Sequence, residues 1–156
     1  MPDRIGYLKG NLSYSDLKER SKEELIRLIL ESTDIEVPIS VFSGSLPPLT
    51  SLVKYLSVSR KLSVKEIASR LNRHEQTIWT VLRNSRRSKA TFAASEITVP
   101  LSIFCKDRHS ILESLTNYLT VERNMRIGEI ALLLNKSIKT IWTCQSRFDK
   151  KGEKNG

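Results

Sequence analysis

Residues 62–82, LSVKEIASRLNRHEQTIWTVL, form the stretch that determines the expected fold of this 156-residue chain. Ser63 and Glu66 have the spacing of a capping box, which predicts that a helix begins here. A second short helix is expected from residue 74 or 75 onward, where apolar residues again recur at helical spacing. Asn72 lies between the two helices, and asparagine tolerates the left-handed backbone that a tight turn requires. The stretch therefore predicts two helices joined by a sharp turn.

The same pattern occurs a second time along the chain. Residues 125–145, MRIGEIALLLNKSIKTIWTCQ, align with the first stretch. When residues 55–82 are aligned with residues 118–145, 13 of the 28 positions are identical. Upstream, VPISVF at residues 37–42 reappears as VPLSIF at residues 99–104. Matches of this extent indicate a duplicated module.

Each copy contains a further helix before the helix–turn–helix pattern. In the first copy Pro47 and Pro48 favour a helix start. The apolar stripe that follows at helical spacing consists of Leu49, Leu52, Val53 and Leu56. The V-P-x-S-x-F segments alternate in an extended manner, and each is expected to dock as a short arm onto its own module. The expected fold class is all-α, with two tandem three-helix helix-turn-helix modules at residues 36–88 and 97–148 and a linker at residues 89–96.

The two ends of the chain differ from the modules. Residues 1–35 form an N-terminal extension in which Ser21 and Glu24 begin another capping box and an amphipathic helix. Two roles are open for residues 21–33: packing on a module, or homodimerisation. Residues 149–156, DKKGEKNG, have almost no apolar side chain and predict a mobile tail.

Charge is concentrated in the two modules. The chain has 26 Lys and Arg against 17 Asp and Glu, a net charge of +9. Residues 1–35 carry −1, residues 36–96 carry +6 and residues 97–156 carry +4. A polyanionic partner, with nucleic acid as the leading candidate, is therefore expected at the modules.

Several classes of protein are not expected from this sequence. No apolar run approaches the length of a membrane span, and no signal-peptide pattern begins the chain, so a cytoplasmic, nucleoid-associated protein is predicted. Cys105 and Cys144 are far apart, and their thiols are expected to be buried and unreactive. No catalytic triad, carboxylate pair, glycine-rich phosphate loop or zinc motif is present. We expect no enzymatic activity, no cofactor, no metal and no membrane association.

Both copies of the helix–turn–helix pattern resemble the helix-turn-helix of sigma-factor region 4 and of response-regulator DNA-binding domains. Those families share an E-I-A-x-x-L-N-x-x-x-x-T-[VI] core, and the resemblance covers about 21 residues per module. It implies that the last helix of each module is a recognition helix for the major groove. Arg73 and Lys136 depart from the families, because this turn position is usually aliphatic. The V-P-x-S-x-F element belongs to neither family.

The resemblance implies two sets of DNA-contacting residues. The candidates for base edges are His74, Glu75, Gln76, Trp79, Thr80, Arg83, Ser137, Lys139, Trp142, Thr143 and Ser146. The candidates for phosphates are Arg73, Thr77, Arg86, Arg87, Lys89, Lys136, Thr140 and Arg147. Gln76 suits adenine, whereas Lys139 or Arg83 suits guanine. For the two tryptophans, half-buried packing is the alternative to DNA contact, because each directly follows a buried isoleucine.

The expected function is binding of double-stranded DNA by a transcriptional regulator or chromatin factor, without an enzymatic step. Glu75 and Gln76 are replaced by Ile138 and Lys139 in the second module, which predicts different half-sites. Successive recognition helices one turn apart predict a footprint of about 20 base pairs. Two alternatives stay open: a protein-assembly factor that uses the modules as scaffolds, and an RNA- or ribosome-binding protein.

Overall fold

The computed structural model describes residues 18, 20–26, 34–106 and 108–153. The chain divides into two units, Met1–Ile35 and Glu36–Gly156. In the first unit residues 22–26 are helical, and the Glu24 backbone N–H donates a hydrogen bond to Ser21 Oγ at 3.3 Å. The rest of the proposed packing or dimerisation segment lies outside the described residues.

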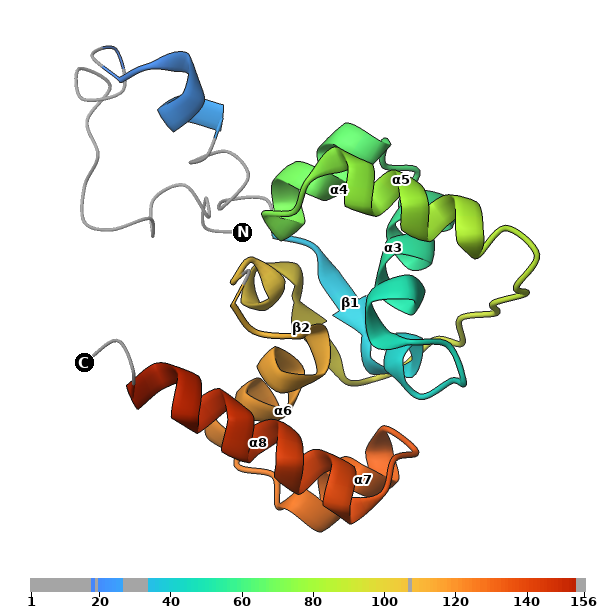
Figure 1. The fold of residues 1–156 in the computed structure, drawn as a ribbon, viewed down its shortest axis with the longest axis vertical. Helices are drawn as coiled ribbons and strands as arrows, with labels where there is room; N and C mark the ends of the chain where they lie inside the picture. Colours follow the sequence, from blue (N-terminus) through green and yellow to red (C-terminus); the bar gives the residue numbers. More distant parts are fainter. Residues whose placement is uncertain (1–17, 19, 27–33, 107, 154–156) are drawn as a thin grey trace. The chain divides into compact units, whose positions relative to one another are not determined.

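The second unit is mostly helical, as the predicted all-α class requires, and contains one two-stranded sheet. Its first half contains β1 (Glu36–Pro38), the 3₁₀ helix η2 (Ile39–Phe42), α3 (Pro48–Val58), α4 (Val64–Leu71) and α5 (Glu75–Asn84). Its second half contains β2 (Thr98–Pro100), the 3₁₀ helix η3 (Leu101–Phe104), α6 (Ile111–Val121), α7 (Ile127–Leu133) and α8 (Ile138–Glu153). Figure 1 shows the two sets of helices on opposite sides of the β1–β2 pair.

The local signals for helix starts and turns are confirmed. Glu66 N donates to Ser63 Oγ at 3.2 Å, and Ser63 N donates to Glu66 Oε2 at 2.7 Å, which completes the capping box of α4. α3 begins at Pro48. Asn72 and Asn135 have φ values of 51° and 52°, the left-handed conformation expected of the turns before α5 and α8.

The main apolar core positions of the two halves correspond. In each half the three helices pack on one another, α5 on α3 and α4, and α8 on α6 and α7. Five fully buried helical side chains of the first half are Leu52, Leu56, Ile67, Leu71 and Ile78, and their counterparts 63 residues later, Leu115, Leu119, Ile130, Leu134 and Ile141, are fully buried too. Burial of each such side chain contributes about 1.5–3 kcal/mol, so the duplicated apolar pattern maintains two equivalent cores.

The V-P-x-S-x-F arms were predicted to be extended and to dock on their own modules, and the structure differs on both points. Each is extended as far as its proline and then forms a 3₁₀ turn, η2 or η3. In a strand, Ile39 and Phe42 would point to opposite faces, whereas a 3₁₀ turn aligns residues three apart and lets both be buried. η2 packs on α3, as expected, but η3 packs on both α6 and α4.

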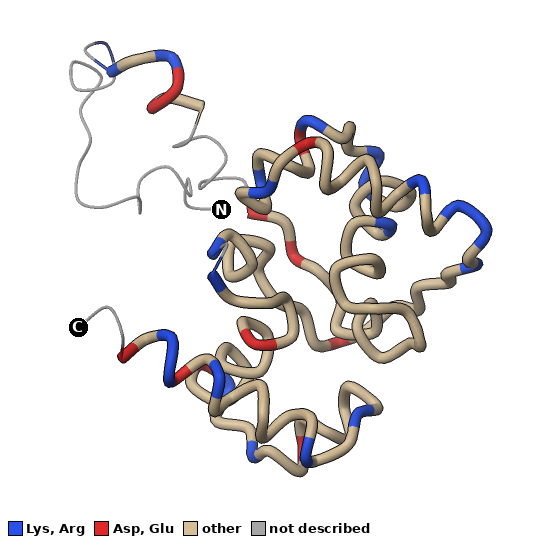
Figure 2. Tube along the Cα trace, in the orientation of Figure 1, with Lys and Arg blue, Asp and Glu red and all other residues tan. Residues whose placement is uncertain are grey.

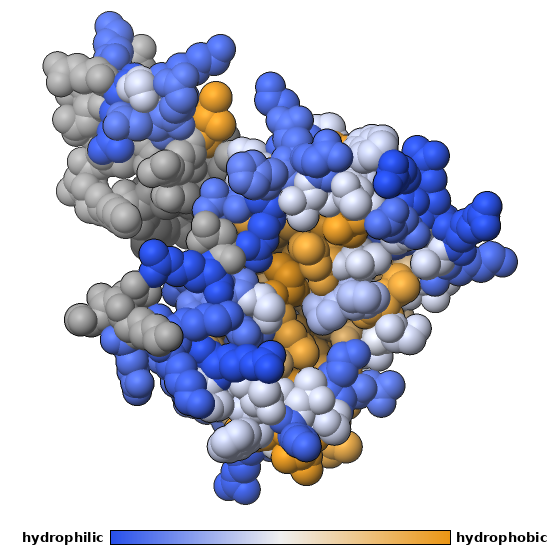
Figure 3. All heavy atoms as spheres, viewed as in Figure 1, coloured by the Kyte–Doolittle hydropathy of each residue, from blue (hydrophilic) through white to orange (hydrophobic). Residues whose placement is uncertain are grey.

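The extended parts of the arms pair with each other. β1 and β2 are antiparallel, with Val37 opposite Val99, and Ile39 N donates to Ile97 O at 2.9 Å. Both valines are fully buried. Figure 3 shows apolar atoms gathered between the two halves on the viewed face, with hydrophilic side chains around them. The halves therefore share an apolar contact in addition to their separate cores.

The predicted tail and the predicted linker, both polar in composition, make specific contacts with the helices. α8 continues to Glu153, where a mobile tail from residue 149 was predicted, because Lys151 Nζ pairs with the buried Glu113 carboxylate at 2.7 Å. In the predicted linker, the Phe92 ring packs edge-on against Tyr55 with centroids 5.6 Å apart. Ser40 Oγ also donates a hydrogen bond of 2.5 Å to Ala93 O.

Candidate nucleic-acid interface

The first turns of α5 and α8 present the same pattern of exposure. Ile78 and Ile141 are fully buried and fix each helix on its own half. The preceding residues therefore lie at the surface, and all of the following are exposed: His74, Glu75, Gln76, Thr77, Ser137, Ile138, Lys139 and Thr140. The structure thus brings the predicted contact residues of each half together at the start of one helix.

The two tryptophans lie at the surface. Trp79 is 44% exposed and Trp142 is 61% exposed. Half-buried packing, the alternative reading of these residues, therefore does not describe Trp142, and it leaves much of the Trp79 ring accessible. The Arg83 guanidinium lies over the Trp79 ring, 4.8 Å from its centroid, and the cation–π contact orients this candidate base-contacting arginine along α5.

The hydroxyl groups of Thr80 and Thr143 bond within their own helices. Thr80 Oγ1 donates to Gln76 O, and Thr143 Oγ1 donates to Lys139 O, each at 2.8 Å. Both side chains are half-buried. Each hydroxyl oxygen can still accept a hydrogen bond, because only its hydrogen is used. These threonines therefore suit a donor, such as an N–H group of a base edge or the O–H group of a water molecule.

The N-caps of the two candidate recognition helices differ. Thr140 N donates to Ser137 Oγ at 3.1 Å, and the Ser137 and Thr140 hydroxyls lie 2.7 Å apart. His74 makes no side-chain cap to α5. Ser137 is therefore the better N-cap of the two, and its hydroxyl, predicted to contact a base edge, also caps the helix.

Basic side chains cluster at the end of α5 and in the turn that follows it. Arg83, Arg86, Arg87 and Lys89 are exposed there, and Figure 2 shows Lys and Arg positions gathered around the end of α5 and the loop beyond it. In the second half Arg147 is exposed and Ser146 is half-buried on α8. Four exposed cations in seven residues form a region suited to phosphate contact.

Lys54 supports this basic turn from inside the protein. Its side chain is buried on α3, and its Nζ donates to Ser85 O at 2.7 Å and to Ser88 O. An ammonium group at the carboxyl end of α5 also interacts favourably with the helix dipole. The role of Lys54 could not be predicted from the sequence, where its only signal is a single lysine between the apolar Val53 and Tyr55.

Arg73 and Lys136, the basic residues at the unusual turn position, each contact the opposite half. Arg73 Nη2 donates to His109 O at 3.2 Å, and Lys136 Nζ donates to Gly44 O at 3.2 Å. Each acceptor lies in the loop that follows the 3₁₀ turn of the other half. The contacts give a structural reason for a basic residue at this turn position, and both side chains are half-buried rather than fully exposed.

His109 lies in a cluster between α6 and α8. Its ring stacks on Phe148 with centroids 4.1 Å apart, and Nδ1 is 3.7 Å from Glu113 Oε2. Burial lowers the pKa of His109, and the positive charges of Lys151 and Lys106 act in the same direction, whereas the Glu113 carboxylate acts against them. The cluster ties the carboxyl-terminal half of α8 to α6.

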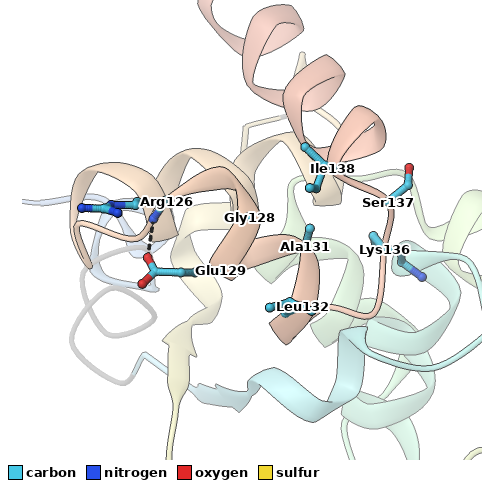
Figure 4. A pocket seen from close by; sticks show the side chains of 8 residues that line it. All are labelled: Arg126, Gly128, Glu129, Ala131, Leu132, Lys136, Ser137 and Ile138. Atoms are coloured by element: carbon cyan, nitrogen blue, oxygen red, sulfur yellow. Dashed lines mark hydrogen bonds between the residues drawn. The ribbon is translucent and has the colours of Figure 1, made fainter.

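The corresponding surface of the second half is more apolar than that of the first. Leu132 is 86% exposed and Ile138 is 62% exposed, whereas Ser69 and Glu75 occupy the same positions in the first half. An open pocket lies beside them between α7 and the start of α8. In Figure 4 Arg126 and Glu129 stand at one end of it, and Ala131 and Leu132 lie toward the middle.

The chemistry of the remaining candidate groups is limited. Cys144 is buried, and burial raises the pKa of its thiol, while Cys105 Sγ donates to Arg70 O at 2.7 Å. Among the described residues no group of three or more His, Cys, Asp or Glu side chains could hold a metal ion. Within the same residues, no helix has the length and apolar character to cross a bilayer.

Comparison with protein-family models, curated proteins and solved structures found no match to this chain.

Proposed function

We propose that residues 36–156 form two helix-turn-helix modules that bind double-stranded DNA, with α5 and α8 as recognition helices in the major groove. The chain would act as a transcriptional regulator or chromatin factor. The observation that carries the proposal is the T-I-W-T tetrad shared by both helices, at residues 77–80 and 140–143. Core packing explains the buried isoleucines, but it does not explain why the exposed threonine and tryptophan beside them are also identical.

The proposed affinity comes from the basic residues and the specificity from the first turn of each helix. Exposed Arg86, Arg87 and Lys89 would neutralise phosphates beside α5, which makes binding dependent on salt. Gln76 in the first half and Lys139 in the second are exposed at positions suited to adenine and guanine edges. Because the two residues differ, the half-sites would differ too.

A salt titration with random 30-base-pair DNA tests the proposal, with double-stranded RNA of the same length in parallel. The test variant is R86Q/R87Q, and the matched control is R20Q/K22Q, in which two exposed cations are removed from the other unit. Both variants lower the net charge equally. The test variant should reduce the slope of log K against log salt by about 2, at about 0.9 per lost phosphate contact, and the control should leave it unchanged.

The other outcomes separate the alternatives. An equal reduction of the salt slope in both variants would show that general charge, rather than the turn after α5, drives binding. Tighter binding to the RNA duplex would favour an RNA-binding protein. Binding that is weak and independent of salt would exclude nucleic acid as the main partner.

The apolar surface of the second half favours one other function, the docking of a protein partner. Leu132 and Ile138 are exposed beside the pocket at the start of α8. If this surface contacts DNA, L132S/I138E, which installs the residues of the first half, should change affinity for a specific DNA site. If it contacts only a protein, the same variant should leave the DNA affinity intact.

A further inference from the structure

The strand pair joins each arm to the matching residues of the other copy. Val37 and Val99 are equivalent in the repeat, and they lie directly opposite each other between β1 and β2. On either side, Glu36 pairs with Pro100 and Pro38 pairs with Thr98. A residue that lies opposite its own equivalent marks a two-fold axis, because a simple translation of one copy along the chain would pair different positions.

A second contact has the same property. Phe42 and Phe104 are equivalent, and their rings pack on each other with centroids 5.4 Å apart. Both rings are buried, so this pair and the valine pair place the axis through the apolar contact between the halves.

The polar contacts between the halves are also exchanged. Arg73 of the first half bonds to the loop after η3, and Lys136, its equivalent, bonds to the loop after η2. Figure 1 agrees with this relationship: α5 and α8 lie on opposite sides of the strand pair and run in opposite directions across the view. Two copies in head-to-tail order would present their helices in the same direction.

We propose that a pseudo-two-fold axis between Val37 and Val99 relates the two halves, and that the chain binds an imperfect inverted repeat in duplex DNA. The inference rests on the proposed function and specifies its substrate. A duplex has two-fold axes perpendicular to its length, so a protein with two-fold symmetry binds half-sites of opposite orientation. Tandem modules without this axis would instead bind a direct repeat.

The two half-sites are related but not identical. The exposed positions of the two reading surfaces differ at Glu75 and Ile138, at Gln76 and Lys139, and at Ser69 and Leu132. The shared T-I-W-T tetrad would contact the bases that the two half-sites have in common. The differing residues would contact the bases at which the half-sites differ. The site is therefore an inverted repeat whose halves match only in part.

A rearrangement series tests the orientation. The intact chain selects a site from random 30-base-pair duplexes, and footprinting defines the two protected segments. These segments are then rebuilt as inverted, direct and everted repeats with spacers of increasing length. We expect an arrangement with oppositely oriented half-sites to bind at least about tenfold more tightly than the direct repeat at its best spacing, because only opposite orientations let a two-fold protein engage both helices at once.

Transplanting the first-turn residues of one recognition helix onto the other tests the same inference without altering the contact between the halves. The variant S137H/I138E/K139Q gives α8 the exposed first turn of α5, and all three positions are exposed. It should make the two halves of the preferred site more alike, because α8 then presents the first-turn residues of the first half-site's reader, while Leu132 and Ser146 keep their own identity. The reciprocal variant H74S/E75I/Q76K should do the same, with α5 presenting the first-turn residues of α8.

The outcomes distinguish this inference from the proposed function. A chain that binds DNA but prefers the direct repeat, or shows no preference at any spacing, overturns the two-fold inference and leaves DNA binding in place. A transplant variant that selects a direct repeat does the same. A chain with no salt-dependent DNA binding overturns both.

Discussion

Phe42 and Phe104 hold equivalent positions in the two copies of the repeat, and their rings pack on each other with a centroid separation of 5.4 Å and an interplanar angle of 46°. Each ring ends a 3₁₀ turn that follows the paired strands. The contact joins the two halves together with the β1–β2 pairing and the packing of η3 on α4.

The pair should be energetically coupled. We expect F42L and F104L each to lower the free energy of unfolding by about 1–3 kcal/mol. The double variant should lose about 0.5–1.5 kcal/mol less than the sum of the two, because the ring contact can be lost only once. Urea denaturation of the four proteins measures this coupling. Strict additivity would show that the rings stabilise each half separately.

Lys54 should matter for both stability and DNA binding. K54M leaves the carbonyl groups of Ser85 and Ser88 without their buried donor and should cost about 1–3 kcal/mol. It should also weaken DNA binding, because the basic turn after α5 loses its support. Lys65 is exposed on α4, so K65M is the control for stability and should change it by no more than about 0.5 kcal/mol. Equal stability of K54M and the control would contradict the structural role.

The two tryptophans can report on the two halves separately. Trp79 and Trp142 are the only tryptophans in the chain and both are exposed. W142F leaves Trp79 as the sole emitter, and W79F leaves Trp142. On addition of the selected duplex, both single-tryptophan proteins should show a change in fluorescence with the same midpoint, because one site engages both helices. A change in only one protein would show that only one half contacts DNA.

Stability should fall as the pH drops below the ordinary range of histidine titration. Burial lowers the pKa of His109 in the folded protein, so the unfolded chain takes up this proton first on acidification. The stabilisation is present above about pH 6.5 and is lost as the pH falls toward the lower, folded-state pKa. Urea midpoints between about pH 7.5 and 5.5 should therefore vary less for H109Q than for the wild type. His74 is exposed and lies outside this cluster, so H74Q serves as the control for loss of an imidazole.

Features encoded by neighbouring residues could be predicted from the sequence. The Ser63–Glu66 capping box, the helix start at Pro48 and the left-handed Asn72 and Asn135 all depend on contacts within a few residues. The exposed first turns of α5 and α8 could also be predicted, because the positions of Ile78 and Ile141 fix which face of each helix is buried.

Contacts between distant residues could not be predicted. The Val37–Val99 pairing joins strands of three residues, too short for an alternating pattern to identify or to set in register. Arg73 and Lys136 are predicted phosphate contacts, and the sequence gives no sign of the backbone carbonyls of the other half that they also reach. The Lys151–Glu113 pair extended α8 into a segment whose composition resembled a mobile tail.

The paired strands have a consequence for how binding would depend on protein concentration. A single half would expose the edge of its strand and its phenylalanine, and a second copy would be the natural complement to both. Here the complement belongs to the same polypeptide, so the halves meet at a fixed, high effective concentration. A regulator that must first dimerise loses its DNA site steeply on dilution. This chain should instead occupy its site along a simple hyperbola, with one molecule per site even when only a few copies are present.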